Sequence, residues 1–193
     1  AVAPVQVVIV PVAQHKEGVL EKARELCGRL SAAGFRVKLD DSENTAGWKY
    51  AEYEMKGVPV RLELGPRDIE SGQCVLVSRH DRKKDFVSLD GLEKSVADKL
   101  EEVRLGLWSK ALQNRERRTH ACTSLDEIKA SLAENGDGFI KAMWCGSEEC
   151  EDKVKELTGV GSRCIPFAQE QISDRCVCCG KPARQMVLWA KAY

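Results

Sequence analysis

The sequence has no excess of charge of either sign, few aromatic residues and no long apolar run. Lysine and arginine number 30, and aspartate and glutamate also number 30, so the formal net charge is zero. A neutral chain has no global positive field, so any attraction for nucleic acid must come from a local patch. No apolar stretch reaches the roughly 18 residues of a membrane-spanning helix. We therefore expect no membrane partner and a cytoplasmic protein.

Motifs that bind nucleotides or hold a catalytic nucleophile are also missing. The chain contains no Walker-type phosphate loop, no strand-linked GxGxxG and no GxSxG. Its histidines, His15, His80 and His120, are scattered, so we expect no catalytic triad and no catalytic residue. The first residues lack both an initiator methionine and the charged region of a signal peptide, and they open almost directly on a strand pattern. This beginning indicates an excised fragment.

Alternating helix and strand patterns fill the first 118 residues. Apolar runs and period-two alternation predict strands at residues 5–12, 35–39, 58–64, 74–78 and 86–89. Apolar residues spaced three and four apart predict helices at 19–30, 48–56 and from 90 onward, the last with Leu107 and Ala111 on its apolar face. Strands mixed with helices over this length predict a layered α/β domain with a mixed sheet, residues 1–118.

A second, smaller unit is expected at residues 119–193, after an arginine-rich stretch that reads as a helix end or linker. Ser124 and Glu127 form a capping-box pattern before a helix that ends near residue 135. The patterns further predict strands at 139–144, 164–167 and 186–193 and a short helix at 148–157. This order predicts a small α+β domain.

Cysteine is concentrated in this second unit. Six of the nine cysteines in the chain lie after residue 144. An odd count without a secretory signal argues against a disulfide scaffold. Two pairs, Cys145 with Cys150 and Cys176 with Cys179, have the spacing of a structural zinc site, and Gly180 suits the tight turn that such a site needs. Cys178 could replace one ligand, the thiols could instead be buried without metal, and Cys176 with Cys179 could be a redox pair. Four protein ligands would close the site, so we expect a structural ion rather than a catalytic one.

Residues 47–68 combine aromatic, acidic and basic side chains on elements that adjoin in sequence. Tyr50 and Glu54 share one helix face, Arg61 follows on the next strand, and a basic run comes later at residues 82–84. Unpaired RNA bases are recognised by such a set, because rings stack, carboxylates accept from guanine N–H groups and cations reach phosphates. The alternative is a solvated face with ordinary ion pairs.

The same stretch resembles the anticodon-binding domain of prolyl-tRNA synthetases of the archaeal and eukaryotic type, which also occurs in some bacteria. The resemblance covers essentially the whole chain. The matching motifs are Pro-Val-Gln-Val-Val-Ile-Val-Pro11, Gly-Trp-Lys-Tyr50, Lys-Gly-Val-Pro-Val-Arg61, Gly-Pro-Arg-Asp68, Cys164-Ile-Pro-Phe167, the two cysteine pairs and the ending Ala190-Lys-Ala-Tyr193.

The resemblance implies a five-stranded mixed sheet flanked by helices, followed by a zinc-binding C-terminal domain. It implies recognition of the two guanines of the proline anticodon, within an enzyme that attaches proline to its tRNA using ATP and is a homodimer. Matched by position, the anticodon-contact candidates are Tyr50, Glu54, Arg61, Arg67, Asp68 and Lys83. The zinc ligands fall on Cys145, Cys150, Cys176 and Cys179, and the carboxylate of Tyr193 would reach toward the parent active site.

The catalytic domain of that family, which binds ATP with Mg²⁺ and proline, has no counterpart among these residues. We therefore expect this chain to bind proline tRNA weakly, to partner with a catalytic domain of the parent chain and to catalyse nothing alone. The alternative is a stand-alone accessory or interaction protein built on an anticodon-domain fold with a structural zinc site.

Overall fold

The computed structural model describes residues 2–192, and these divide into two compact units, residues 1–109 and 110–193. The order of the first elements is β1 (Val7–Pro11), α1 (Val19–Ala32), β2 (Val37–Leu39), α2 (Ala46–Met55), β3 (Val60–Leu64), α3 (Pro66–Glu70), β4 (Gln73–Ser78), β5 (Lys84–Ser88) and α4 (Leu92–Arg117). None of the described helices combines the length and apolar character that a bilayer span requires.

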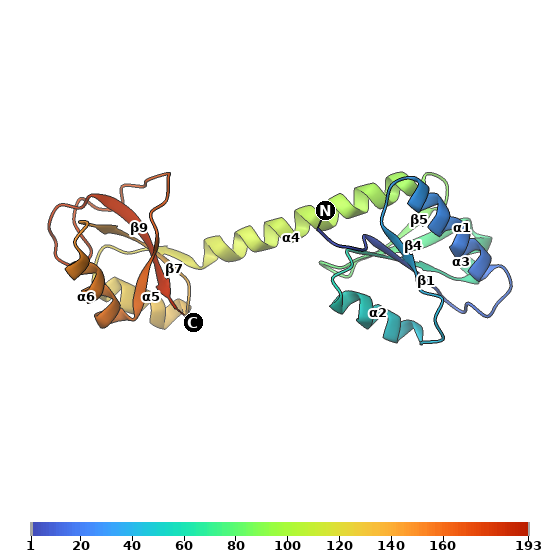
Figure 1. The fold of residues 1–193 in the computed structure, drawn as a ribbon, viewed down its shortest axis with the longest axis horizontal. Helices are drawn as coiled ribbons and strands as arrows, with labels where there is room; N and C mark the ends of the chain where they lie inside the picture. The colour runs from blue at the N-terminus through green and yellow to red at the C-terminus, as the bar shows by residue number, and fades with distance from the viewer. Residues whose placement is uncertain (1, 193) are drawn as a thin grey trace. The chain divides into compact units, whose positions relative to one another are not determined.

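The first unit is a five-stranded mixed sheet in the order β2-β1-β3-β4-β5, as expected. Strand β1 is parallel to both β2 and β3, whereas β3, β4 and β5 run antiparallel to one another. Strand β1 is apolar on both faces because helices cover both. On one face α1 and α4 pack on Ile9, Leu62 and Leu76, and on the other α2 packs on Val8 and Val10 (Figure 1).

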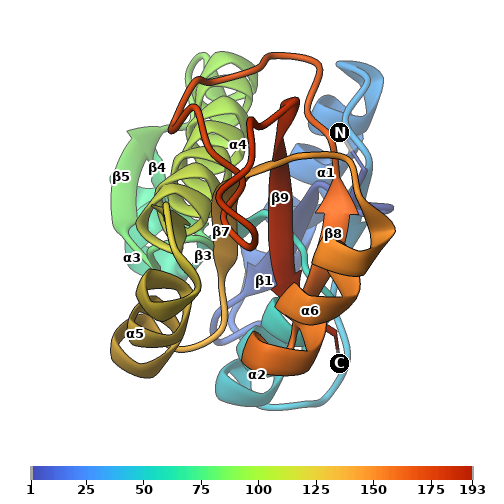
Figure 2. The same ribbon diagram turned by 90° about the vertical axis from the view of Figure 1, so that its left-hand side faces the viewer.

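The second unit consists of β6 (Thr119–Ala121), α5 (Leu125–Asn135), β7 (Phe139–Trp144), α6 (Glu148–Thr158), β8 (Val160–Cys164) and β9 (Gln185–Lys191). Its four-stranded sheet has the order β6-β7-β9-β8, with β6 parallel to β7 and the remaining pairs antiparallel. Figure 2 shows this sheet with α5 and α6, whose residues Ile128 and Val154 bury against Trp189.

Several local predictions were wrong, each for a physical reason. No helix was expected between the strands at 58–64 and 74–78, but Pro66 begins the short helix α3 because proline suits the first helical position. Residues 165–167 were expected in a strand, but the β8 strand ends at Cys164 and Phe167 is fully exposed. The apolar face of α4 ends at Val103, the last helix residue in the first core, so Leu107 and Ala111 are exposed.

Of the two alternatives expected for residues 111–120, the helix end is confirmed, because α4 continues to Arg117 and strand β6 begins at Thr119. The capping box at the start of α5 is confirmed in part. The Ser124 hydroxyl accepts from the Glu127 amide at 3.2 Å. The Glu127 carboxylate accepts from the Thr123 amide at 2.6 Å, one residue before the position that a capping box uses.

Candidate RNA interface and candidate metal centre

A buried lysine fixes the start of α2, the helix that carries two of the candidate residues. Lys49 is 2% exposed, and its ammonium group donates to the backbone oxygen of Asp40 at 2.9 Å and to the side chain of Gln14 at 3.2 Å. The carboxylate of Asp40 lies 3.7 Å away and supplies the opposite charge that a buried ammonium needs. Thr45 caps the helix by accepting from the Trp48 amide. The helix is therefore held at its first turn, which fixes the direction of Tyr50 and Glu54.

Tyr50, Glu54 and Arg61 come together, as their positions in the sequence predict. The guanidinium carbon of Arg61 lies 3.8 Å from the centre of the Tyr50 ring, which is a stacked cation–π contact. An Arg61 nitrogen donates to Glu54 at 3.3 Å, and another lies 2.9 Å from Glu63. The Tyr50 hydroxyl also donates to Glu63. Burial, followed by the negative charge of Glu63, raises the pKa of Tyr50 to about 12, so the phenol stays neutral at physiological pH.

Basic side chains from the β4–β5 hairpin extend this cluster toward solvent. Arg82 is 3.0 Å from Glu54, and Lys84 is 3.1 Å from Glu63. Their side chains remain 76% and 54% exposed, respectively. The strand register explains the position of Lys84, because Arg61 pairs with Val77 and Val77 pairs with Lys84 on one sheet face.

Arg79 also contacts the cluster, since its Nε donates to the backbone oxygen of Glu54 at 3.1 Å. Sequence reasoning missed Arg79 and the role of Glu63. Only the register of the hairpin could have identified them, because neither belongs to a motif.

Three other predicted residues lie outside these contacts. Arg67 and Asp68 are in α3, which begins after the far end of β3, about 13 Å of strand beyond Arg61. Asp68 accepts from the Gly65 amide at 2.7 Å and thereby caps α3, while Arg67 is exposed. Lys83 pairs with Asp85 at 3.4 Å rather than with the acids that Lys84 and Arg82 contact.

The surface formed by Tyr50, Glu54, Arg61, Arg82 and Lys84, here called the α2 cluster, has the chemistry to hold an unpaired base. Glu54 is 30% exposed and offers a carboxylate that accepts hydrogen bonds, whereas Arg61 is only 11% exposed. Arg61 therefore mainly holds Glu54 and Tyr50 in place. The exposed cations at the rim are suited to phosphates.

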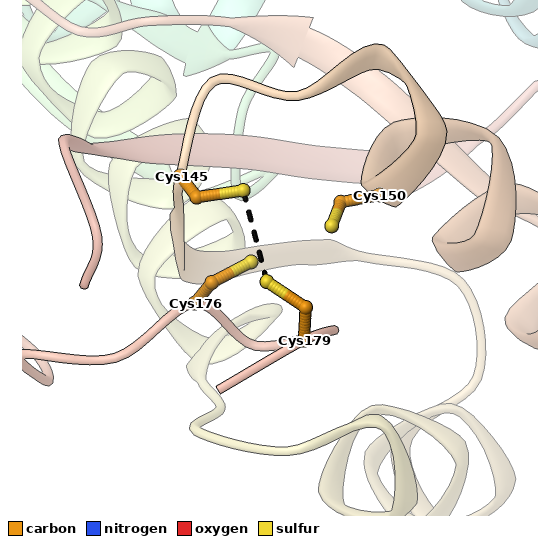
Figure 3. A group of neighbouring side chains, drawn as sticks. All are labelled: Cys145, Cys150, Cys176 and Cys179. Atoms are coloured by element: carbon orange, nitrogen blue, oxygen red, sulfur yellow. Dashed lines mark hydrogen bonds between the residues drawn. The ribbon is translucent and has the colours of Figure 1, made fainter. Parts of the chain in front are cut away.

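The four predicted metal ligands also converge, in the second unit. Their sulfur atoms lie within 4.8 Å of one another, and those of Cys145 and Cys179 are 3.9 Å apart. Cys145 follows β7, Cys150 lies in the first turn of α6, and the other two lie on the loop between β8 and β9. Figure 3 shows the four sulfur atoms pointing toward one another.

Backbone hydrogen bonds shape the turn that carries Cys176 and Cys179. The Gly180 amide donates to the Cys176 oxygen at 3.0 Å, and the Cys176 amide donates to the Lys181 oxygen at 2.8 Å. Gly180 has a φ of 68°, the left-handed region that favours glycine. Val177 donates to the Met143 oxygen at 2.9 Å, which ties this loop to β7.

The donor set fits a tetrahedral metal ion. Four sulfurs at about 2.3 Å from zinc stand about 3.8 Å apart, close to the Cys145–Cys179 separation. The backbone N–H of Lys181 lowers the pKa of Cys179 to about 7, while burial raises the pKa of Cys145 and of Cys150. A bound cation would deprotonate the latter two. All nine cysteines are free of disulfides, and Cys178 lies outside the group, packed against the second core.

Two further points complete the placement of the predicted residues. Tyr193 lies outside the described residues. His80, Asp81 and Glu102 form another group with metal-ligand geometry, but Glu102 is already paired with Lys99 at 2.5 Å. We assign no ion to that group.

Comparisons with known proteins identify both units. Residues 6–99 match the family described as "Anticodon binding domain". Residues 125–193 match the family described as "Prolyl-tRNA synthetase, C-terminal". Among curated proteins, the chain is 56% identical over 193 residues to a proline--tRNA ligase of Ruminiclostridium cellulolyticum. It is 57% identical over 192 residues to proline--tRNA ligase 2 of Bacillus thuringiensis subsp. konkukian. Each match covers 100% of this chain and 40% of the relative, so the chain spans about 40% of the length of these relatives.

The fold and the matches define the first unit as an anticodon-binding domain of the kind that aminoacyl-tRNA synthetases carry. More particularly, the second unit is a prolyl-tRNA synthetase C-terminal domain. The order of the two domains is that expected from the motifs in the sequence.

Proposed function

We propose that this chain reads the anticodon of proline tRNA as the C-terminal part of a prolyl-tRNA synthetase. The observation that carries the proposal is the α2 cluster, which places a carboxylate, an aromatic ring and exposed cations together on an anticodon-binding domain. The parent enzyme would attach proline to its tRNA using ATP and Mg²⁺ in its catalytic domain. This chain alone would be inactive.

Within the α2 cluster, Glu54 would accept hydrogen bonds from the N1–H and N2–H of a guanine, the two donors that distinguish it from adenine. Tyr50 would stack on the base, and Arg61 would hold both residues while presenting one edge. The cation Lys83 and the α3 residues Arg67 and Asp68 would contact the neighbouring nucleotides. An RNA strand spans these separations, because successive nucleotides are several ångströms apart.

For the second domain, we propose a structural Zn²⁺ held by Cys145, Cys150, Cys176 and Cys179. The convergence of the four sulfurs supports this assignment. An ion with four protein ligands has no open position for water, so its role would be to hold β7, α6 and the β8–β9 loop together.

Further features of the parent protein extend the proposal. We propose the archaeal and eukaryotic-like type of the enzyme, a cytoplasmic location, a homodimeric parent and a terminal Tyr193 carboxylate directed toward its active site. We also propose the domain boundary between residues 118 and 119, directly after α4.

Fluorescence anisotropy with labelled tRNA tests the main proposal. The intact chain should bind proline tRNA more tightly than a copy whose two anticodon guanines are replaced by adenines. Removing one good base contact costs about 1–3 kcal/mol, so the difference should be at least about fivefold. Equal affinity for the two tRNAs would show that the chain does not read the anticodon.

A further inference from the structure

The second unit contains a cavity of about 520 Å³ that shares no residue with the cysteine cluster. Its walls come from the last turns of α4, the start of β7 and the facing ends of β8 and β9. This volume lies in the range of pockets that hold small organic ligands.

Positive charge dominates the lining. Arg115, Arg118, Arg163 and Lys191 all line the cavity, and Asp137 is the only carboxylate among its lining residues. Asp137 lies 3.5 Å from Lys191, so one of the four cations is largely balanced. The lining thus has more cations than its own acid can neutralise, which favours an anionic occupant.

Two of the three arginines in the lining are held by backbone oxygens, which orient a guanidinium group without neutralising its charge. Arg118 donates to the backbone oxygen of Asp137, and Arg163 donates to the backbone oxygen of Ala190 at 2.8 Å. These contacts fix the two guanidinium groups but leave their charge uncompensated. The Arg115 side chain has no hydrogen bond or ion pair among the described residues. Several N–H donors therefore remain for a ligand, and guanidinium groups match phosphate geometry well.

Close backbone packing brings an aromatic ring to the same wall. A Cβ on Gly138 would lie 2.3 Å from the Arg118 oxygen, so only glycine permits this approach. The approach allows the Phe139 amide to donate to the Arg118 oxygen at 2.8 Å, and the Phe139 side chain stays 39% exposed.

The C-terminal end of α4 lies beside the cavity, and its carbonyl oxygens repel an anion only weakly. The Arg115 oxygen accepts from the Arg118 amide at 3.2 Å and from the Thr119 hydroxyl at 2.6 Å. The Asn114 oxygen also accepts from the Arg118 amide. Because these terminal carbonyls already have donors, less of their negative partial charge faces the cavity.

We infer that this cavity is a nucleotide-binding site, in which Arg115 and its basic neighbours bind the phosphate and Phe139 contacts the base. The ligand is a nucleoside phosphate, either free or as one nucleotide of an RNA strand. The site lies in the unit of residues 110–193 and shares no residue with the α2 cluster, so it is independent of the anticodon proposal.

Nuclear magnetic resonance of the intact chain, titrated with adenosine monophosphate, tests this inference. The amides of Gly138 and Phe139 should shift and saturate. Adenosine alone and inorganic phosphate alone should each bind at least about fivefold more weakly, because each lacks one half of the recognition. A three-nucleotide RNA that binds more tightly than the mononucleotide at the same amides would identify an RNA strand as the source. Tighter binding of the mononucleotide would identify a free nucleotide.

A matched pair of variants provides the control. Arg115→Gln and Arg117→Gln remove the same charge two residues apart on α4, but only Arg115 lines the cavity. Arg115→Gln should weaken mononucleotide binding at least about fivefold, and Arg117→Gln less than about twofold. Equal losses in the two variants, adenosine binding as tightly as its monophosphate, or no shift at Gly138 and Phe139 would each overturn the inference.

Discussion

Removal of one zinc ligand should unfold the second domain and leave the first intact. We choose Cys150→Ser, because Cys150 is buried among the four converging thiols and lies on α6, away from the loop that carries Cys176 and Cys179. A hydroxyl is a poor zinc ligand, so the ion should be lost.

The free energy of zinc binding, compared with the stability of the second unit, predicts whether that unit unfolds. A structural zinc contributes about 10–16 kcal/mol to the folding of a small domain. A unit the length of residues 110–193 has a typical total stability of only about 4–13 kcal/mol. The second core is small, with nine buried residues, of which Trp189 is the largest. Loss of the ion therefore removes an amount comparable to or larger than the whole stability of the unit.

The assay combines metal analysis with hydrogen exchange. The wild-type chain should contain one zinc, and Cys150→Ser should contain almost none and lose amide protection in β7 and β9 but not in β1 or β3. Cys164→Ser is the matched control, because Cys164 is exposed and lies outside the thiol group. Full zinc content with unchanged protection in Cys150→Ser would refute the ligand assignment.

Three further predictions concern charge and activity. Lysine at position 99 donates to Asp85, which lowers the pKa of that carboxyl below its ordinary value of 3.8. The stabilising contribution of this ion pair is therefore present above pH 3.8 and is lost as pH falls through the lower folded pKa. The difference between the urea midpoints of wild type and Asp85→Asn should thus be larger at pH 7 than at pH 3, and a difference independent of pH would contradict the assignment. Lys84→Ala should weaken all tRNAs alike and reduce the salt dependence of binding by about one charge; a selective loss for proline tRNA would contradict the phosphate role. Finally, the chain should show no proline-dependent ATP–pyrophosphate exchange. Exchange above background would contradict the proposal that only the catalytic domain of the parent enzyme activates proline.

Most elements of the first domain could be predicted from periodicity, because its helices and strands are long enough to repeat an apolar pattern. The apolar run at β1 and the spacing of Val19, Ala23, Leu26 and Leu30 on α1 match buried faces. The five-stranded mixed sheet was expected from the family resemblance and is confirmed. Neither α3 nor β6 has a buried residue, so no apolar pattern marks them in the sequence and both were missed.

The site could be predicted only where sequence neighbours become spatial neighbours. Tyr50, Glu54 and Arg61 meet because α2 and β3 are consecutive and joined by a short turn at Gly57. The contact from Arg79 depends on the pairing of β4 with β3, which no local pattern reveals. The buried Lys49 was likewise unforeseen, because its partners come from two separate loops.

The most direct test of anticodon reading is the ratio of the dissociation constants for an anticodon-substituted tRNA and for proline tRNA, measured in Glu54→Ala and in wild type. Glu52→Ala is the control, since Glu52 lies on the same helix but pairs with Lys56 at 2.5 Å, outside the α2 cluster. We predict that the wild-type ratio is at least about fivefold, that Glu54→Ala brings it close to one, and that Glu52→Ala leaves it unchanged. A ratio that stays the same in Glu54→Ala, with both tRNAs weakened equally, would contradict the account, because Glu54 would then not contact a base.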